Sequence, residues 1–265
     1  YEVLNEVQQT LFVDRHSKSS GLTECSTLDG KPLKRYIDTR NYVSALGILR
    51  EDTPTYPSKL AANSVAQHLP KYESLLHSKG YLDYSGILAE ASRALCQDKS
   101  LRKRLAERVK HVIVDEYQDV NPLQERLIRG LAKHGANVCV VGDDDQTIYQ
   151  WRGSEVRNIL TFASRYPGVR QVTLAENFRS STGIVDLGRS IAERLPAASR
   201  LPKDMSAAGH QQWHRGDTLA LTFDSQEEEA TWICDRIQRL IGTGFRDAPD
   251  AAPRGLSWSD FAVLF

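Results

Sequence analysis

Three short apolar runs between residues 111 and 181 constrain the fold of this chain most. They read HVIVDEYQDVN, NVCVVGDDDQTIYQWRGS and QVTLAENFRSS. Each begins like a buried strand and ends in a cluster of Asp, Glu, Gln or Arg. Because the ligand crevice of an open α/β sheet lies at the carboxyl ends of its strands, we expect the three clusters to surround one site. Their side chains favour metal-assisted phosphate chemistry.

Strand and helix patterns alternate from Val109 onward. The run 112–114 is short and β-branched, which is typical of a strand buried in a parallel sheet. Pro122 suits the first turn of a helix that reaches about Lys133. Further strands are expected at 138–141, 172–174, 218–223 and from 261, and further helices at 155–165, from 181 and at 227–240. This alternation predicts βαβ units around a parallel sheet.

The first 108 residues have a mainly helical pattern. Apolar residues recur at helical spacing over 58–76 and again over 84–95. Pro70, inside the first of these segments, is expected to mark a boundary or a kink. The basic segment 99–110 is either a solvated helix face or a surface that follows nucleic-acid phosphates, and the pattern leaves both open.

Composition excludes several classes of protein. The 265 residues have zero net charge and an ordinary apolar fraction, as in soluble globular proteins. No apolar run approaches the roughly 18 residues that a membrane span needs, and no signal pattern opens the chain. Four scattered cysteines without a CxxC pair argue against a zinc site and a disulfide framework. We therefore expect a cytoplasmic protein without a membrane partner.

The first polar cluster contains Asp115 and Glu116. A carboxylate at a strand tip can hold Mg²⁺, which typically uses one or two protein carboxylates together with substrate phosphates. The neighbouring Glu116 can orient or deprotonate an attacking water. The alternative is a pair of solvated acids near the amino terminus of the helix that begins at Pro122.

The second cluster combines carboxylates, a glutamine and aromatic residues. Asp143 to Asp145 allow a two-metal nuclease site, although no matching acidic or His cluster accompanies them. Gln146 can instead hydrogen-bond a terminal phosphate and sense its loss. Tyr149, Trp151 and Arg152 together resemble a stacking platform for unpaired bases, whereas an isolated Trp more often packs in a core.

The third cluster contains Phe178 and Arg179. An arginine at a strand end can reach a phosphate that is being transferred and stabilise its charge. The adjacent Phe178 can lie flat on an adenine. An ordinary surface arginine explains the same residues equally well.

Taken together, these segments resemble the UvrD/Rep-type superfamily 1 helicases, which move 3′ to 5′ along single-stranded DNA. VDEYQDVN resembles helicase motif II, VVGDDDQTIYQWRGS resembles motif III and LAENFRS resembles motif IV. The segment 71–88 resembles the stretch that leads into motif II, and the helix from Gln226 with SDFAVLF resembles the opening of the second motor domain. The resemblance is strongest over roughly 80–185.

The resemblance implies a role for each site residue. Asp115 would bind Mg²⁺, Glu116 would activate the hydrolytic water, and Gln146 would sense the γ-phosphate of ATP. Arg179 would act as an arginine finger, and Phe178, at a position where the family commonly has Tyr, would stack on the adenine. Trp151, with Arg152 and Tyr149 nearby, would contact a DNA base.

The sequence also lacks parts of the family pattern. No GxxxxGK[ST] loop, which would hold the β- and γ-phosphates, is present, and motifs V and VI are missing. We therefore expect the middle section of a longer helicase, truncated at both ends. Such a chain by itself is predicted not to hydrolyse ATP.

The expected fold class is α/β, with a partial RecA-like (P-loop NTPase) parallel sheet and a mainly helical N-terminal accessory subdomain. The expected domains are the accessory subdomain at 1–108, the rest of the first motor at 109–172 and the start of the second motor at 173–265. The expected partners are ATP, Mg²⁺, single-stranded DNA and single/double-strand junctions. The alternatives are a degenerate DNA-binding protein without ATP turnover and a metal-dependent nuclease. The sequence does not distinguish repair, replication restart and recombination.

Overall fold

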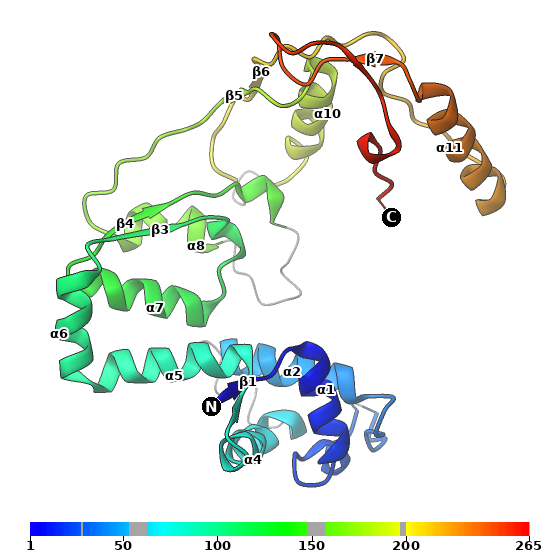
Figure 1. Ribbon diagram of the computed structural model, residues 1–265. Helices are drawn as coiled ribbons and strands as arrows, with labels where there is room; N and C mark the ends of the chain where they lie inside the picture. Colours follow the sequence, from blue (N-terminus) through cyan, green and yellow to red (C-terminus); the bar gives the residue numbers. More distant parts are fainter. Residues whose placement is uncertain (28, 53–62, 148–156, 197–199, 265) are drawn as a thin grey trace. The chain divides into compact units, whose positions relative to one another are not determined.

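The chain is a mixed α/β protein, mostly helical with small parallel sheets. The computed structural model describes residues 1–27, 29–52, 63–147, 157–196 and 200–264 (Figure 1). The chain is divided into two compact units. The first unit comprises Tyr1–Val169 and Ala198–Leu201, and the second comprises Arg170–Ala197 and Pro202–Phe265.

The first part of unit 1 is helical, as the sequence predicts. Its helices and strands are β1 (Glu2–Val3), α1 (Glu6–Arg15), η1 (Leu22–Glu24), α2 (Thr39–Asp52), α4 (Ser64–Ser78), β2 (Tyr81–Leu82), α5 (Tyr84–Gln97) and α6 (Lys99–Arg108). β1 and β2 form a short parallel pair. The apolar core contains Leu4, Phe12, Val13, Leu22, Cys25, Tyr42, Val43, Leu46, Tyr72 and Leu76.

The boundary predicted at Pro70 was wrong, because α4 continues through this residue, and the alternative of a kink stays a prediction. Tyr72 and Leu76, which follow Pro70 in the same helix, are buried in the core, so tertiary packing outweighs the hydrogen bond that a proline cannot donate. The predicted helix over 84–95 is confirmed by α5.

A buried polar network joins the helices of this core. The carboxylate of Asp83 caps α5 by accepting from Gly86 N at 2.7 Å. It also accepts from the Tyr72 hydroxyl at 2.8 Å and from Gln9 Nε2 at 3.0 Å, and it pairs with the guanidinium of Arg50. A buried carboxylate is tolerated when its oxygens are hydrogen-bonded, so this network fixes α1, α2, α4 and α5 relative to one another.

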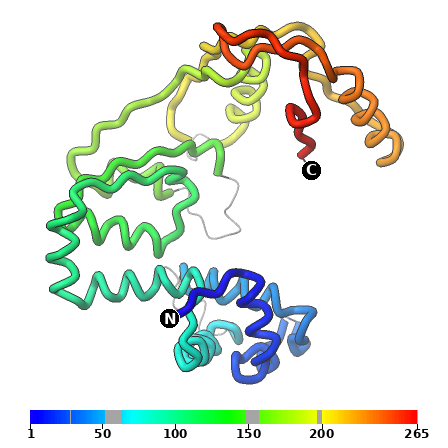
Figure 2. The backbone as a smooth tube through the Cα atoms, viewed as in Figure 1, coloured from blue at the N-terminus to red at the C-terminus, as the bar shows by residue number. Residues whose placement is uncertain are grey.

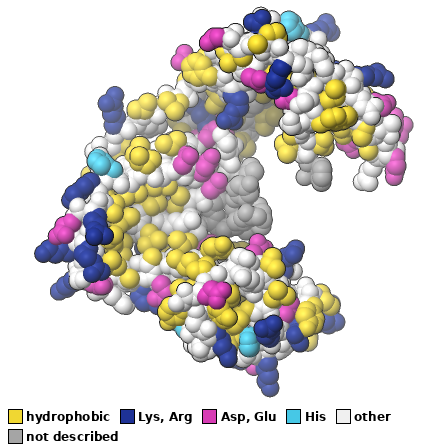
Figure 3. Space-filling model, viewed as in Figure 1, with side chains coloured by type: hydrophobic (Ala, Val, Ile, Leu, Met, Phe, Trp, Pro, Cys, Tyr) yellow, Lys and Arg dark blue, Asp and Glu magenta, His cyan; other side chains and the backbone are white. Residues whose placement is uncertain are grey.

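The basic segment forms α6. Lys103, Arg104 and Arg108 are exposed, and Figure 3 shows Lys and Arg side chains gathered where α6 lies. Arg102 instead donates to the carbonyl of Cys96 at 2.6 Å, at the end of α5. Both interpretations of this helix, as a solvated face and as a phosphate contact, stay predictions.

The second part of unit 1 contains the two predicted parallel strands. β3 (His111–Val114) pairs with β4 (Asn137–Val140), with His111 opposite Asn137 and Val114 opposite Val140. The predicted helix is α7 (Pro122–Lys133), which begins with a capping box between Asn121 and Gln124. Helices α5 and α7 lie side by side (Figure 2). Short turns follow each strand: η2 (Tyr117–Asp119) and η3 (Asp144–Gln146).

The predicted helix over 155–165 is divided in two. The described residues form α8 (Arg157–Leu160) and α9 (Phe162–Arg165), with Thr161 between them. Glu125 of α7 anchors this segment, since its carboxylate pairs with Arg165 and accepts from the Tyr117 hydroxyl at 2.5 Å. Burial, with the adjacent Glu125, raises the pKa of Tyr117, so the phenol stays a donor. Around it lies a core of Tyr117, Val120, Ile128, Ile159 and Phe162.

Unit 2 confirms the predicted helices but not the predicted strands. Its helices and strands are β5 (Glu176–Asn177), α10 (Thr182–Ala192), β6 (Ser206–Ala207), α11 (Gln226–Leu240), β7 (Gly244–Phe245), β8 (Arg254–Gly255) and η6 (Trp258–Asp260). β5 and β6 are parallel, and β7 and β8 are antiparallel.

The described residues of the strands predicted at 172–174, 218–223 and 261–265 form no regular secondary structure. Val172, Leu174 and Leu219 are largely exposed instead. A strand needs a neighbour for its backbone hydrogen bonds, and no described segment pairs with these three. These expectations were therefore wrong.

Two expectations from composition concern cysteines and membranes. All four cysteines lie in the described part of the chain, and all are free. None of the described helices combines the length and the apolar character that crossing a membrane requires.

Candidate functional site

The carboxyl ends of β3 and β4 bring the first two polar clusters together. The amide of Val141 donates to the carbonyl of Val114 at 2.8 Å, and the amide of Tyr117 donates to the carbonyl of Val141 at 2.9 Å. The ladder of the two strands therefore continues into the loops that carry Asp115, Glu116 and Gln146. This part of the expected site is assembled within one unit.

Asp115 presents one available oxygen at the end of β3. Its Oδ1 accepts from the backbone amide of Glu116 at 2.9 Å, and the side chain is exposed. Its other oxygen has no hydrogen-bond partner within the described residues. A single exposed carboxylate fits Mg²⁺ in phosphate sites, where the ion keeps waters and uses few protein ligands.

Glu116 adopts a backbone conformation that is rare for its residue type. Its φ of 49° and ψ of 45° lie in the left-handed region. Such conformations cluster at functional sites, where the surrounding structure maintains them. The exposed carboxylate is also held, because Gln118 Nε2 donates to its Oε2 at 2.6 Å.

Gln118 is a residue that the sequence reasoning missed. Its side chain is buried, with 1% exposure, although it lies in a polar stretch of the sequence. Its Oε1 accepts from the backbone amide of Asp143 at 3.0 Å, in the loop after β4. The local sequence does not indicate this burial, because the side chain of Gln118 is bonded to Asp143, which lies in the second cluster and is distant in the sequence.

Gln146 lies in η3 and is exposed. Its Nε2 donates to Oδ2 of Asp143 at 2.8 Å. The predicted phosphate sensor is therefore oriented by the same residue that contacts Gln118. The structure brings Glu116 and Gln146, two of the predicted site residues, into one hydrogen-bonded group.

The three consecutive aspartates have separate partners. Asp144 is buried and accepts from the amide of Leu201 at 2.8 Å, and Asp145 pairs with Arg200 through contacts of 2.7 and 3.0 Å. Within the described residues no group of three His, Cys, Asp or Glu side chains is arranged to hold a metal ion. The nuclease interpretation therefore has no geometric support in this part of the chain.

Asp119 ends the turn that begins at Tyr117. Among the described residues its Oδ1 is a buried oxygen without a hydrogen-bond partner. Burial, followed by the charge of Glu116, raises the pKa of this carboxyl. Asp119 thus adds a second acid beside Glu116.

The third cluster lies in unit 2. Asn177 Oδ1 accepts from the amides of Arg179 at 2.9 Å and Ser180 at 2.8 Å, which fixes the turn after β5. The side chains of Phe178 and Arg179 are exposed, and neither has a hydrogen bond or ion pair within the described residues. Their approach to Asp115 stays a prediction. Tyr149, Trp151 and Arg152 lie outside the described residues.

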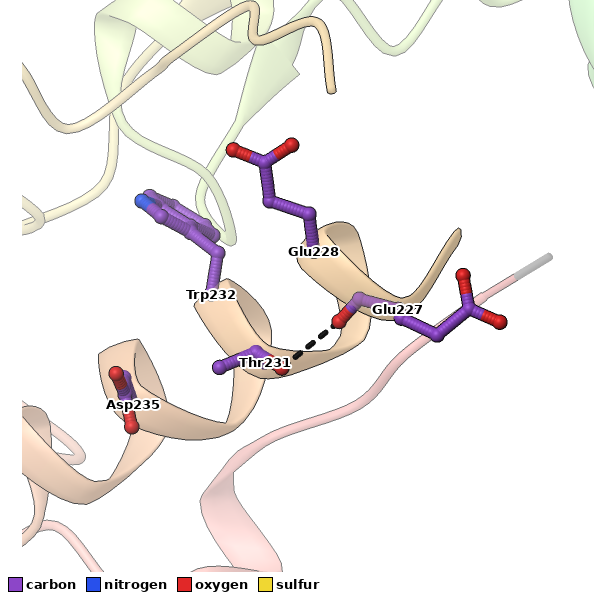
Figure 4. Close-up of a pocket in the computed structure, with 5 residues that line it drawn as sticks. All are labelled: Glu227, Glu228, Thr231, Trp232 and Asp235. Atoms are coloured by element: carbon purple, nitrogen blue, oxygen red, sulfur yellow. Dashed lines mark hydrogen bonds between the residues drawn. The ribbon is translucent and has the colours of Figure 1, made fainter. Parts of the chain in front are cut away.

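A shallow pocket on α11 offers a different arrangement of acids. Figure 4 shows Glu227, Glu228, Thr231, Trp232 and Asp235 around it. All five belong to one helix, and the Thr231 hydroxyl is already bonded to the carbonyl of Glu227 at 2.8 Å. A groove along a single helix does not enclose a ligand, so we place no site here.

Residues 10–167 match the family model described as the UvrD/REP helicase N-terminal domain. This chain belongs to the UvrD/REP helicase family. The match covers β3, β4 and the loops that carry the first two clusters.

Bacterial helicases of this family are similar over most of the chain. The ATP-dependent DNA helicase UvrD1 of Mycobacterium leprae is 30% identical over 256 residues, which are 89% of this chain and 31% of that protein. DNA helicase II of Rickettsia typhi is 31% identical over 224 residues, covering 79% of this chain and 33% of that protein. PcrA of Bacillus subtilis is 29% identical over 185 residues, covering 68% and 24%. The chain spans a third or less of these relatives.

Proposed function

We propose that this chain supplies the hydrolytic and sensing residues of an ATP-dependent DNA helicase that moves 3′ to 5′ on single-stranded DNA and unwinds duplexes. One observation carries the proposal. In a chain of the UvrD/REP helicase family, Glu116 is held at the end of a parallel strand and is hydrogen-bonded into the loop that carries Gln146. This is where ligands bind in open α/β sheets.

The proposed fold is RecA-like. Residues 1–108 form a helical accessory subdomain, 109–172 the remainder of the first motor domain, and 173–265 the beginning of the second. The parallel pairing of β3 and β4 with α7 between them in sequence supports this assignment for the first motor.

Each residue has a proposed role in ATP hydrolysis. Asp115 holds Mg²⁺, which supplies charge stabilisation to the phosphates. Glu116 takes a proton from the attacking water, and its Oε1 is the oxygen that Gln118 leaves available. Gln146 contacts the γ-phosphate. Arg179 stabilises the charge on the phosphoryl group that is transferred, and Phe178 stacks on the adenine.

The same loop is proposed to contact DNA. Trp151, with Tyr149 and Arg152, stacks on unpaired bases of single-stranded DNA or of a single/double-strand junction. Gln146 and Trp151 are five positions apart in the sequence, so a movement at the γ-phosphate reaches the base contact through a short segment.

Hydrolysis of ATP by the full-length gene product tests this proposal. We expect single-stranded DNA to stimulate hydrolysis and Glu116→Gln to reduce it by about 10²- to 10⁴-fold, because the general base is lost. Glu107→Gln, on the exposed face of α6, is the matched control and should retain activity. Full activity of the Glu116→Gln variant would exclude Glu116 as the base.

A second candidate is a single-stranded DNA-binding protein without ATP turnover. It would bind DNA through Tyr149, Trp151 and Arg152 without using Glu116 and Gln146 in hydrolysis. Fluorescence anisotropy with a labelled oligonucleotide separates the two. The helicase proposal expects the affinity of the full-length protein to change when a non-hydrolysable ATP analogue is added, whereas the second candidate expects no change.

A further inference from the structure

We infer that Gln118 is a positioning residue that links Glu116 to the Gln146 loop through its buried amide. The inference rests on the proposed function, because it assigns Glu116 and Gln146 their roles in ATP hydrolysis. It extends that function by naming the side chain that holds Glu116 in a fixed position relative to the loop of Gln146.

The first half of the link is the pair of bonds that Gln118 makes. Its Nε2 donates to Glu116 Oε2 at 2.6 Å, and its Oε1 accepts from Asp143 N at 3.0 Å. The amide therefore joins the loop after β3 to the loop after β4. With 1% exposure, the side chain is shielded from water.

The second half runs from Asp143 to the sensor. Asp143 Oδ2 accepts from Gln146 Nε2 at 2.8 Å, and Asp143 Oδ1 accepts from Asp145 N at 3.1 Å. The residue whose backbone contacts Gln118 thus also orients Gln146. A shift of Gln146 toward or away from a phosphate therefore reaches Glu116 through two intervening residues.

Gly142 leaves room for the side chain of Gln118 between the two loops. A Cβ added to Gly142 would lie 2.6 Å from Gln118 Oε1, 2.9 Å from Ile159 Cδ1 and 3.1 Å from the backbone nitrogen of Tyr117. The last atom is backbone and cannot move aside cheaply. Glycine at 142 is thus what allows the amide to reach Asp143.

The link requires a side chain that offers both a donor and an acceptor, as the amide of Gln118 does. Glu116 needs a donor and Asp143 N–H needs an acceptor, and only a side chain that has both can join them. A glutamine with only a packing role would hydrogen-bond buried groups through both its Nε2 and its Oε1. Here the donor ends on an exposed carboxylate, which is the group proposed to act on water.

Amide hydrogen exchange of this chain tests the link without any catalysis. In Gln118→Ala the Asp143 amide should exchange about 5- to 10-fold faster, as expected for the loss of one hydrogen bond. Gln118→Glu should keep that protection, because its carboxylate still accepts. Gly142→Ala keeps the glutamine but displaces it, and it should accelerate exchange of the same amide.

Kinetics of the full-length gene product test the consequence. Gln118→Ala and Gln118→Glu should each lower kcat by about 10- to 100-fold with little change in the KM for ATP, because Glu116 is misplaced while the nucleotide contacts remain. The control is Gln124→Ala, which removes half of the α7 capping box but touches neither Glu116 nor Asp143. It should retain kcat.

Each outcome bears on one proposal. If Glu116→Gln abolishes hydrolysis and Gln118→Glu retains full kcat, the link is wrong and the proposed function stands. If Glu116→Gln is fully active, the proposed function fails. If the exchange rate of the Asp143 amide is unchanged in Gln118→Ala, the link is wrong whatever the kinetics show. A fall in melting temperature shared equally by Gln118→Ala and Gln124→Ala, with equal kcat, would also overturn it.

Discussion

The edge of β3 and β4 and the turn after β5 hold their predicted site residues in different ways. At the first edge, Glu116 and Gln146 are held by other side chains and by the backbone of the neighbouring loop. At the second, Asn177 fixes only the backbone of Arg179, and the guanidinium is exposed without a partner in the described residues. The first group is pre-organised by its own hydrogen bonds, whereas no hydrogen bond or ion pair among the described residues orients the side chain of Arg179.

The largest effect we predict from this difference is the loss of catalysis in Arg179→Ala. An arginine that stabilises the transferred phosphoryl group is worth about 10³- to 10⁵-fold in kcat, so hydrolysis by the full-length protein should fall by that order. The melting temperature of this chain should change little, because the side chain has no hydrogen bond or ion pair to lose among the described residues. A large fall in melting temperature would show that Arg179 is structural.

Removal of Glu125, in contrast to removal of Arg179, should mainly lower the stability of the fold. Glu125→Ala removes the carboxylate that pairs with the largely buried guanidinium of Arg165 and accepts from the Tyr117 hydroxyl. Breaking a buried ion pair costs about 3–5 kcal/mol, so thermal unfolding should begin at least about 6 °C lower. Arg129→Ala, on the exposed face of the same helix, is the control and should unfold close to the wild type. Equal melting temperatures for the two variants would show that Glu125 does not stabilise the fold.

A smaller effect is predicted at Glu51, which links α2 to the strand part of unit 1. Burial raises the pKa of this carboxyl above its ordinary 4.5, although Asn121 Nδ2 donates to it at 2.8 Å. The folded state therefore binds the proton more tightly, and stability falls as the pH rises above about 4.5. Glu51→Gln keeps an acceptor without the charge, so it should raise the melting temperature at pH 7.5 by about 1–3 °C.

The pH dependence provides the check on this prediction. The difference between Glu51→Gln and the wild type should shrink as the pH falls toward 4, where the native side chain is also protonated. A variant that is less stable than the wild type at pH 7.5 would contradict it.

The sequence predicted those helices and strands whose formation depends on neighbouring residues in the chain. Helix α7 follows from Pro122 in its first turn and from the capping box that begins at Asn121. β3 and β4 were predicted from β-branched runs, and the two strands pair with each other. The run 172–174 has the same local character but no partner in the described residues, so it forms no strand.

The site was predicted only where side-chain chemistry marks it. Asp115, Glu116 and Gln146 could be proposed from charge and position, and the structure brings Glu116 and Gln146 into one network. Gln118 could not, because its burial depends on Gly142 and Asp143, which are more than 20 positions away. Tertiary packing, which the local sequence does not show, places the donor and the acceptor of this amide between the two loops.

The most direct test of the account is the single-turnover rate of ATP hydrolysis by full-length Glu116→Gln, measured together with its affinity for ATP. We predict a rate lower by about 10²- to 10⁴-fold and an affinity unchanged within about twofold, because the base acts on water and not on the nucleotide. An unchanged rate would contradict the account. So would a loss of rate that follows entirely from weaker binding of ATP.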